Sequence, residues 1–185
     1  MNKLVITAAF VLMVLAQWFV PGNMIYVEEN VLEKGTMYKF KTQPIDPTDP
    51  FRGKYIVLDY EVDSFKSDKK ICDYNDELYV SLGVDSLGYA KAVKVGREKP
   101  DSGDYVIAEC SGYRNRDGLQ RFNLPFNTYY MNEDKALEAE LAVREVQRDS
   151  LPTVCYGVVY VFKDRAVLDD VQIDGVSIKD YVEEP

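Results

Sequence analysis

Apolar and polar residues follow three different patterns along the chain, and each pattern predicts a different kind of element. The first is a run of 17 residues, from Leu4 to Val20, in which only Thr7 and Gln17 are polar. A run of about 17 residues is the lower limit for a helix that spans a bilayer. The run therefore predicts an N-terminal transmembrane helix, with Trp18 near its far end as an interfacial anchor.

Two interpretations of this N-terminal segment remain open. Residues 1–22 are either an uncleaved membrane anchor, followed by a lead-in over residues 23–36, or a secretory signal peptide. Val14-Leu15-Ala16 offers small residues at a cleavage point, as a signal peptide requires. Lys3 before the run and the acidic pair Glu28-Glu29 after it favour a C-terminal part outside the cytoplasm. Both interpretations predict that the rest of the chain lies on the periplasmic side of the cell membrane.

The second pattern is the alternation of apolar and polar residues that is typical of β-strands. It is clear in Met37 to Thr42, where Tyr38 and Phe40 share one face. Further apolar stretches flank short turn sequences, which predicts antiparallel hairpins. The paired stretches are 78–84 with 89–95, 105–113 with 119–124, and 154–162 with 166–173. The polar segment 64–76 is predicted to be a loop.

The third pattern is helical and comes late in the chain. Asn132 is the predicted N-cap of a helix that ends before Pro152. Its apolar side is predicted to consist of Ala136, Leu137, Ala139, Leu141, Val143 and Val146. The predicted fold is therefore mainly β with one long helix, an antiparallel barrel-like or sandwich domain over residues 37–180, plus the N-terminal transmembrane helix. Residues 181–185 are predicted to be a loose acidic tail.

Composition narrows the classes of function. The net charge is −9, and an acidic surface repels phosphate backbones, which argues against nucleic acid as a partner. The chain has no histidine, so the commonest general base and metal ligand is absent. Its three cysteines, Cys72, Cys110 and Cys155, form no CxxC spacing, so we expect no zinc site. No other metal and no cofactor is predicted. Two of them can pair in an oxidising compartment, but the sequence leaves open which two.

One stretch concentrates turn chemistry and charge: residues 44–60 read PIDPTDPFRGKYIVLDY. The two Asp-Pro pairs make a stiff, non-helical corner, because proline fixes its own φ and restricts the preceding residue. A strand is predicted from Tyr55 to Val62. Alternation places Lys54, Ile56, Leu58, Tyr60 and Val62 on the face toward the core, and Tyr55, Val57, Asp59 and Glu61 on the wetter face.

Two interpretations of this stretch remain. It is either a charged, hydrogen-bonded corner that holds two strands in register, or a rigid rim that recognises a partner or peptide. The candidate residues for partner or ligand binding are Asp46, Asp49, Arg52, Gly53, Lys54, Tyr55, Leu58 and Tyr60. No catalytic residue is predicted. An acid–base role for Asp46 and Asp49 is the weaker interpretation, because aspartate before proline is a common turn-former.

Gly53, Tyr55, Leu58 and Tyr60 match a signature that reads Gly-Asp-Tyr-x-x-Leu-x-Tyr, and the chain therefore resembles the GDYXXLXY family of membrane-anchored proteins of unknown function. Lys54 stands where the signature has aspartate, which reverses the charge at that position. The segment of Arg121, Phe122, Glu133 and Glu138 resembles the aromatic-then-glutamate segment of the family and supplies secondary candidates. The resemblance implies a multi-spanning membrane protein as the partner, and no established activity.

These observations favour a non-catalytic interaction module of a membrane complex in the cell envelope. A small-ligand-binding β domain, with Tyr55, Tyr60 and Tyr105 at its mouth, is the first alternative. A hydrolase that depends on carboxylates or on a Ser/Lys pair is the second. The Arg-Gly-x-Tyr sequence resembles type I signal peptidases, but their serine follows the anchor closely, and this chain has no serine before Ser64.

Overall fold

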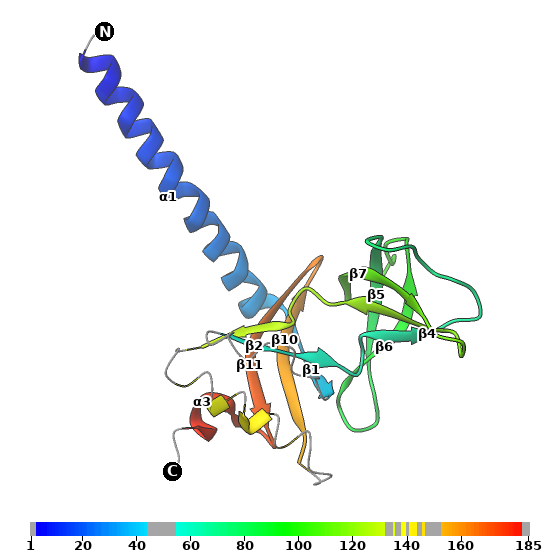
Figure 1. The fold of residues 1–185 in the computed structure, drawn as a ribbon. Helices are drawn as coiled ribbons and strands as arrows, with labels where there is room; N and C mark the ends of the chain where they lie inside the picture. Colours follow the sequence, from blue (N-terminus) through cyan, green and yellow to red (C-terminus); the bar gives the residue numbers. More distant parts are fainter. Residues whose placement is uncertain are drawn as a thin grey trace.

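A computed structural model describes residues 3–43, 55–131 and 153–182, together with 135, 138, 139, 141–143 and 146. A long N-terminal helix projects from a domain of antiparallel strands (Figure 1). The strands curve into a nearly closed, barrel-like arrangement, and the described residues between 135 and 146 are helical. The predicted fold class is therefore confirmed.

The N-terminal helix α1 runs from Lys3 to Lys34 and is long and apolar enough to cross a membrane. None of its most apolar window is buried against the rest of the protein. The helix continues through most of the predicted lead-in, so residues 21–34 extend beyond the apolar run, or roughly 21 Å at 1.5 Å per residue.

The helix passes into the domain through one residue, Gly35. Its amide donates a hydrogen bond to the carbonyl of Val31 at 2.8 Å, and the first strand begins at Thr36. A Cβ on residue 35 would collide with the carbonyl oxygen of Val31 and lie 3.1 Å from that of Val161. Only glycine allows this close approach. The side chain of Val31 is itself buried, so the helix is packed onto the domain rather than tethered by a loose linker.

The strands form two five-stranded sheets and one two-stranded sheet, all antiparallel. In spatial order, the first sheet contains β12 (Val176–Ser177), β11 (Arg165–Ile173), β10 (Cys155–Phe162), β1 (Thr36–Gln43) and β3 (Asp59–Tyr60). The two-stranded sheet pairs β2 (Tyr55–Val57) with β9 (Thr128–Tyr130). The second five-stranded sheet contains β4 (Ser64–Lys66), β8 (Leu119–Asn123), β7 (Tyr105–Arg114), β5 (Glu77–Val84) and β6 (Ala90–Gly96). The described C-terminal part ends with the short helix α3 (Ile178–Tyr181).

The two-stranded sheet helps to close the first sheet on itself. The amide of Leu58 donates to the carbonyl of Asn127 at 2.7 Å, which extends the β2–β9 pairing to the residue directly before β3. From β9, the Tyr129 hydroxyl donates to Asp170 of β11 at 3.1 Å. The two-stranded sheet thereby connects the β3 end of the first sheet with β11, which lies next to its other end.

One hydrophobic core extends across the sheets. At its centre the ring of Phe40 packs edge-on against Tyr60 and Phe126, with centroids 5.6 and 4.9 Å away. The apolar face predicted for the strand that follows residue 54 lies in this core: Ile56, Leu58, Tyr60 and Val62 are all buried. The predicted hairpins correspond to β5–β6, β7–β8 and β10–β11.

Several predicted boundaries were wrong. The strand predicted over 55–62 is divided at Leu58 into β2 and β3, because β2 leaves the first sheet to pair with β9. The predicted loop 64–76 begins with β4, and β9 itself was not predicted. Leu141 is exposed rather than on the buried side of its helical segment. Tyr181, placed in the loose tail, ends α3, which Ser177 caps through a hydrogen bond from the amide of Lys179.

Candidate functional site

The leucine and the final tyrosine of the Gly-Asp-Tyr-x-x-Leu-x-Tyr signature are core residues. Leu58 and Tyr60 are 2% and 1% exposed. The Tyr60 ring crosses β10 at Gly157, where an added Cβ would lie 3.0 Å from the tyrosine oxygen. Its hydroxyl donates to the carbonyl of Phe126 at 3.0 Å, and burial raises the pKa of Tyr60 so that the hydroxyl stays protonated. These two positions stabilise the fold.

Tyr55 is the signature residue on the outer side. It pairs with Tyr130 of β9, and the two rings lie 5.7 Å apart. Tyr130 is 73% exposed, and the neighbouring Val57 of β2 is exposed as well. We call Tyr55, Val57 and Tyr130 the aromatic patch. By contrast, Tyr60 and Tyr105 are buried and do not line an open mouth as the ligand-binding alternative requires.

Other candidate residues from the sequence are only partly accounted for. Asp46, Asp49, Arg52, Gly53, Lys54 and Glu133 lie outside the described residues, so their roles stay predictions. Phe122 is buried in the core, and Glu138 is exposed in the helical segment. Arg121 is exposed on β8 and belongs to a cluster that was not predicted from the sequence.

That cluster consists of Gln43, Asp59, Asp63 and Arg121, and we call it the joint cluster. The Gln43 side-chain amide donates to Asp59 Oδ2 at 2.9 Å and to Asp63 Oδ2 at 3.1 Å. One amide group thus bridges two carboxyl groups. The Arg121 guanidinium lies 3.8 Å from Asp63 Oδ2 and is largely exposed.

Asp63 is the buried member of the joint cluster. The residue is 8% exposed, and its Oδ1 atom is buried and, within the described part of the chain, accepts no hydrogen bond. The pKa of Asp63 is raised to about 7, mainly by burial and then by a hydrogen bond and charge repulsion from Asp59, while Arg121 and Gln43 oppose the shift. A carboxyl group with such a pKa changes charge near neutral pH.

Little in the sequence indicates this cluster. Alternation places Asp59 on the wetter face of its strand, and Asp63 falls between a predicted strand and a predicted loop. The contact depends on the pairing of Gln43 with Asp59 across β1 and β3, and on the turn after β3 that brings Asp63 back to the same amide. Alternation along one strand does not predict either feature.

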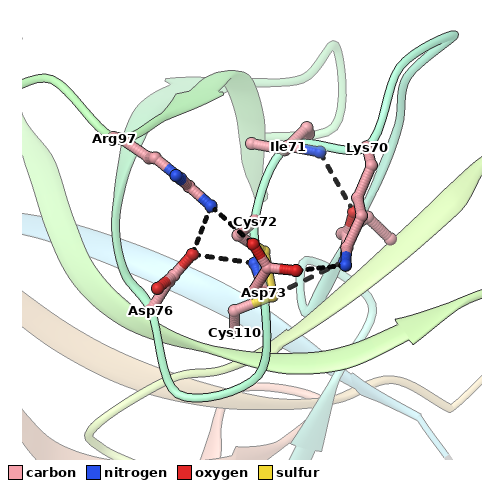
Figure 2. A network of polar contacts seen from close by, with 8 residues as sticks. Lys70, Ile71, Cys72, Asp73, Asp76, Arg97 and Cys110 are labelled. Carbon is pink, nitrogen blue, oxygen red and sulfur yellow. Dashed lines mark hydrogen bonds and ion pairs between the residues drawn. A yellow bond between two sulfur atoms is a disulfide. The ribbon is translucent and has the colours of Figure 1, made fainter.

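A second cluster, also with two aspartates and an arginine, lies at the loop between β4 and β5. It consists of Lys70, Asp73 and Asp76 of that loop and Arg97, which directly follows β6, and we call it the loop cluster. Figure 2 shows Lys70 paired with Asp73, and Arg97 reaching both aspartates. The amide of Asp73 also donates to Asp76 at 2.7 Å. All four side chains are more than a third exposed.

A disulfide lies beneath the loop cluster. Cys72 of the loop is bonded to Cys110 of β7, and both residues are buried (Figure 2). Beside it, the buried Gln120 accepts a hydrogen bond from the amide of Ile71 at 3.2 Å. Cys155 is a buried free thiol. The sequence leaves the pairing open, and the structure assigns it to Cys72 and Cys110.

Fold and cluster geometry define a class: a barrel-like antiparallel domain joined through a single residue, Gly35, to an N-terminal helix long and apolar enough to cross a membrane. Within that class, the chain belongs to the GDYXXLXY protein family, whose model matches residues 17–171. No curated protein and no solved structure matches the chain. The family assignment predicted from the signature around Tyr55, Leu58 and Tyr60 is confirmed.

Proposed function

We propose that this protein is a single-pass, membrane-anchored domain on the periplasmic side of the cell membrane, where it recognises a multi-spanning membrane protein without catalysing a reaction. The observation that carries the proposal is the continuity of α1 with β1. An apolar helix that passes into a folded sheet through Gly35 alone holds the domain at a fixed height and orientation above the bilayer.

The disulfide supports the periplasmic location. Disulfides persist in oxidising compartments and are rare in the cytosol. Cys72 and Cys110 are both buried and already face each other across the loop and β7. Lys3 at the start of α1 and the acidic residues after its apolar part favour the same orientation.

The aromatic patch is the surface that we assign to partner recognition. Tyrosine is enriched at protein interfaces because it combines a large apolar ring with a polar hydroxyl and few rotatable bonds. Tyr55 and Tyr130 present two adjacent rings on the edge of the domain that carries the family signature. The predicted corner residues Asp46, Asp49, Arg52, Gly53 and Lys54 precede this patch directly in the sequence.

The test is co-purification of the full-length protein from membranes in mild detergent after brief chemical cross-linking. The double variant Tyr55→Ala/Tyr130→Ala removes the aromatic patch, and Tyr74→Ala is the matched control because Tyr74 is an equally exposed tyrosine elsewhere, at 74%. We expect wild type and Tyr74→Ala to recover the same membrane protein and the double variant to lose it. Equal recovery by all three proteins, or no membrane protein with wild type, would contradict the proposal.

A protease added to intact spheroplasts tests the location separately. We expect the domain to be degraded from outside, leaving a short fragment that contains α1. Full protection of the domain, with degradation only after lysis, would show that it faces the cytoplasm. This experiment does not depend on the identity of the partner.

A further inference from the structure

The joint cluster lies where the chain passes from the first sheet to the second. Residues 61–63 connect β3 to β4, and Asp63 is held from both sides. Its amide donates to the carbonyl of Tyr60 at 3.1 Å, and its carbonyl accepts from the amide of Phe122 in β8 at 2.8 Å. Its side chain accepts from Gln43 in β1. One residue therefore connects a strand of each sheet.

The carboxyl group of Asp63 is short of hydrogen-bond donors. Oδ2 accepts from Gln43, but the buried Oδ1 has no partner among the described residues. An ionised carboxylate with an unpaired, buried oxygen is costly, and a second carboxylate nearby increases that cost. Protonation removes the charge and supplies an O–H donor. Because Oδ1 is closed to solvent, a proton fits this position where a larger ligand does not.

We propose that Asp63 binds a proton in this buried position beside Asp59, and that release of this proton loosens the joint between the two sheets. The proton comes from solvent, and its release leaves two negative carboxylates on one amide group. Repulsion between them then acts on the turn that contains Asp63. The bonds from Asp63 to Tyr60 and from Phe122 to Asp63 are the first to weaken.

The surrounding charges are consistent with a proton rather than a metal cation as the bound species. Arg121 of β8 places a positive charge 3.8 Å from Oδ2 of Asp63. Farther along the same outer face, Lys41 of β1 and Glu61 of the turn neutralise each other in an ion pair of 2.7 Å. Among the described residues, no group of three or more acidic, histidine or cysteine side chains is placed to hold a metal ion.

The experiment is a pH titration of the full-length protein in detergent micelles, labelled with ¹³C at the aspartate carboxyl carbons and followed by NMR. We expect one aspartate to titrate near neutral pH, and its signal to be absent from Asp63→Asn. Asp101→Asn, at an exposed loop position, is the control and should retain it. Arg121→Met should move the midpoint upward, because it removes the positive charge that favours the ionised form.

The second readout is hydrogen exchange at the amide of Phe122. Exchange is catalysed by base everywhere, so amides of β5 serve as the reference. We expect Phe122 to show an additional increase through the same pH range as the titration, and Asp63→Asn to lack it. If every aspartate titrates close to the ordinary value of about 3.9, the proton site is refuted. If Asp63 titrates near neutrality without the additional exchange, the effect on the joint is refuted.

Discussion

The joint cluster and the loop cluster are built from the same kinds of residue, two aspartates with an arginine beside them, but the protein shifts their pKa values in opposite directions. In the joint cluster, burial and the neighbouring Asp59 raise the pKa of Asp63 to about 7. In the loop cluster, a hydrogen bond and the positive charge from Lys70, and then those from Arg97, lower the pKa of Asp73. The two clusters differ in their fourth member, which is Gln43 in the joint cluster and Lys70 in the loop cluster.

Burial and the number of cations account for the difference. The Asp63 side chain is 11% exposed, whereas that of Asp73 is 68% exposed. Water stabilises the ionised form of Asp73, and two cations lie in contact with it. The side chain of Asp63 is largely shielded from water, and the guanidinium of Arg121 lies 3.8 Å from it. Burial beside a second carboxyl group therefore favours the protonated form of Asp63, while exposure and two cations favour the charged form of Asp73.

The clusters also differ in what holds them in place. The joint cluster is fixed by hydrogen bonds from β1 and β8, both within sheets. The loop cluster lies on a loop that the disulfide ties to β7. Exposed ion pairs contribute little to stability, because water screens their charges and their long side chains lose freedom when they pair. We infer that the disulfide, not the charges, holds the loop.

The largest expected effect is loss of that disulfide. The sequence separation of Cys72 and Cys110 is 38 residues. For a closed loop of this size, the chain-entropy estimate of the stabilisation is about 4 kcal/mol. In Cys72→Ala/Cys110→Ala we therefore expect a large drop in the free energy of unfolding, measured by thermal or denaturant unfolding of the full chain in detergent.

The control for the disulfide variant is Cys155→Ala. Cys155 is buried but unpaired, so this change removes one sulfur from the core and leaves the cross-link intact. It should cost less than the double variant and should leave the protein sensitive to added reductant. If both variants lose the same stability, the disulfide contributes nothing beyond packing and the loop is held by its other contacts.

The next expected effect is at Asp63, and its sign follows from the raised pKa. The folded protein binds the proton more tightly than the unfolded chain, so the free energy of unfolding falls as pH rises from about 4 to about 7. The side-chain amide of the Asp63→Asn variant does not ionise and escapes this loss. We expect Asp63→Asn to be more stable than wild type at pH 8, by roughly 1–3 kcal/mol, the usual cost of an unsatisfied buried group.

The measurement is chemical denaturation at several pH values between about 5 and 8, across the range where the pKa of Asp63 lies. The difference between Asp63→Asn and wild type should grow with pH and then level off. A constant difference across this range would mean that Asp63 does not titrate there. A loss of stability in Asp63→Asn at pH 8 would show that the ionised carboxylate is the favoured form.

The parts that the sequence predicts well are those that depend on local pattern. Alternation places Phe40, Ile56, Leu58 and Tyr60 in the core, and all four are buried. The 17-residue apolar run predicts α1 for the same reason, since length and apolarity are properties of the segment itself. Strand β9 was missed because three residues are too few to show an alternation.

The candidate site was harder to predict because it depends on long-range contacts. Gln43 meets Asp63 only through the pairing of β1 with β3 and the turn that follows. The pairing of Cys72 with Cys110 likewise depends on how the loop after β4 folds against β7. Tyr60 shows a different problem: a tyrosine in a family signature suggests a functional hydroxyl, but this hydroxyl bonds to the carbonyl of Phe126 inside the core.

The smallest expected effect is at the loop cluster, and its sign is opposite to that at Asp63. The pKa of Asp73 is lowered in the folded protein, so its contribution to stability is present above the unfolded pKa of about 3.9 and is lost as pH falls below it. Asp73→Asn should therefore lower Tm at pH 7, by about 2 °C or less for an exposed pair in a chain of this size. The difference should shrink in high salt, because salt screens exposed charges. Asp63→Asn should keep its stabilising effect in the same salt, because its cause is burial. If salt abolishes both effects equally, the two clusters do not differ in burial as the comparison requires.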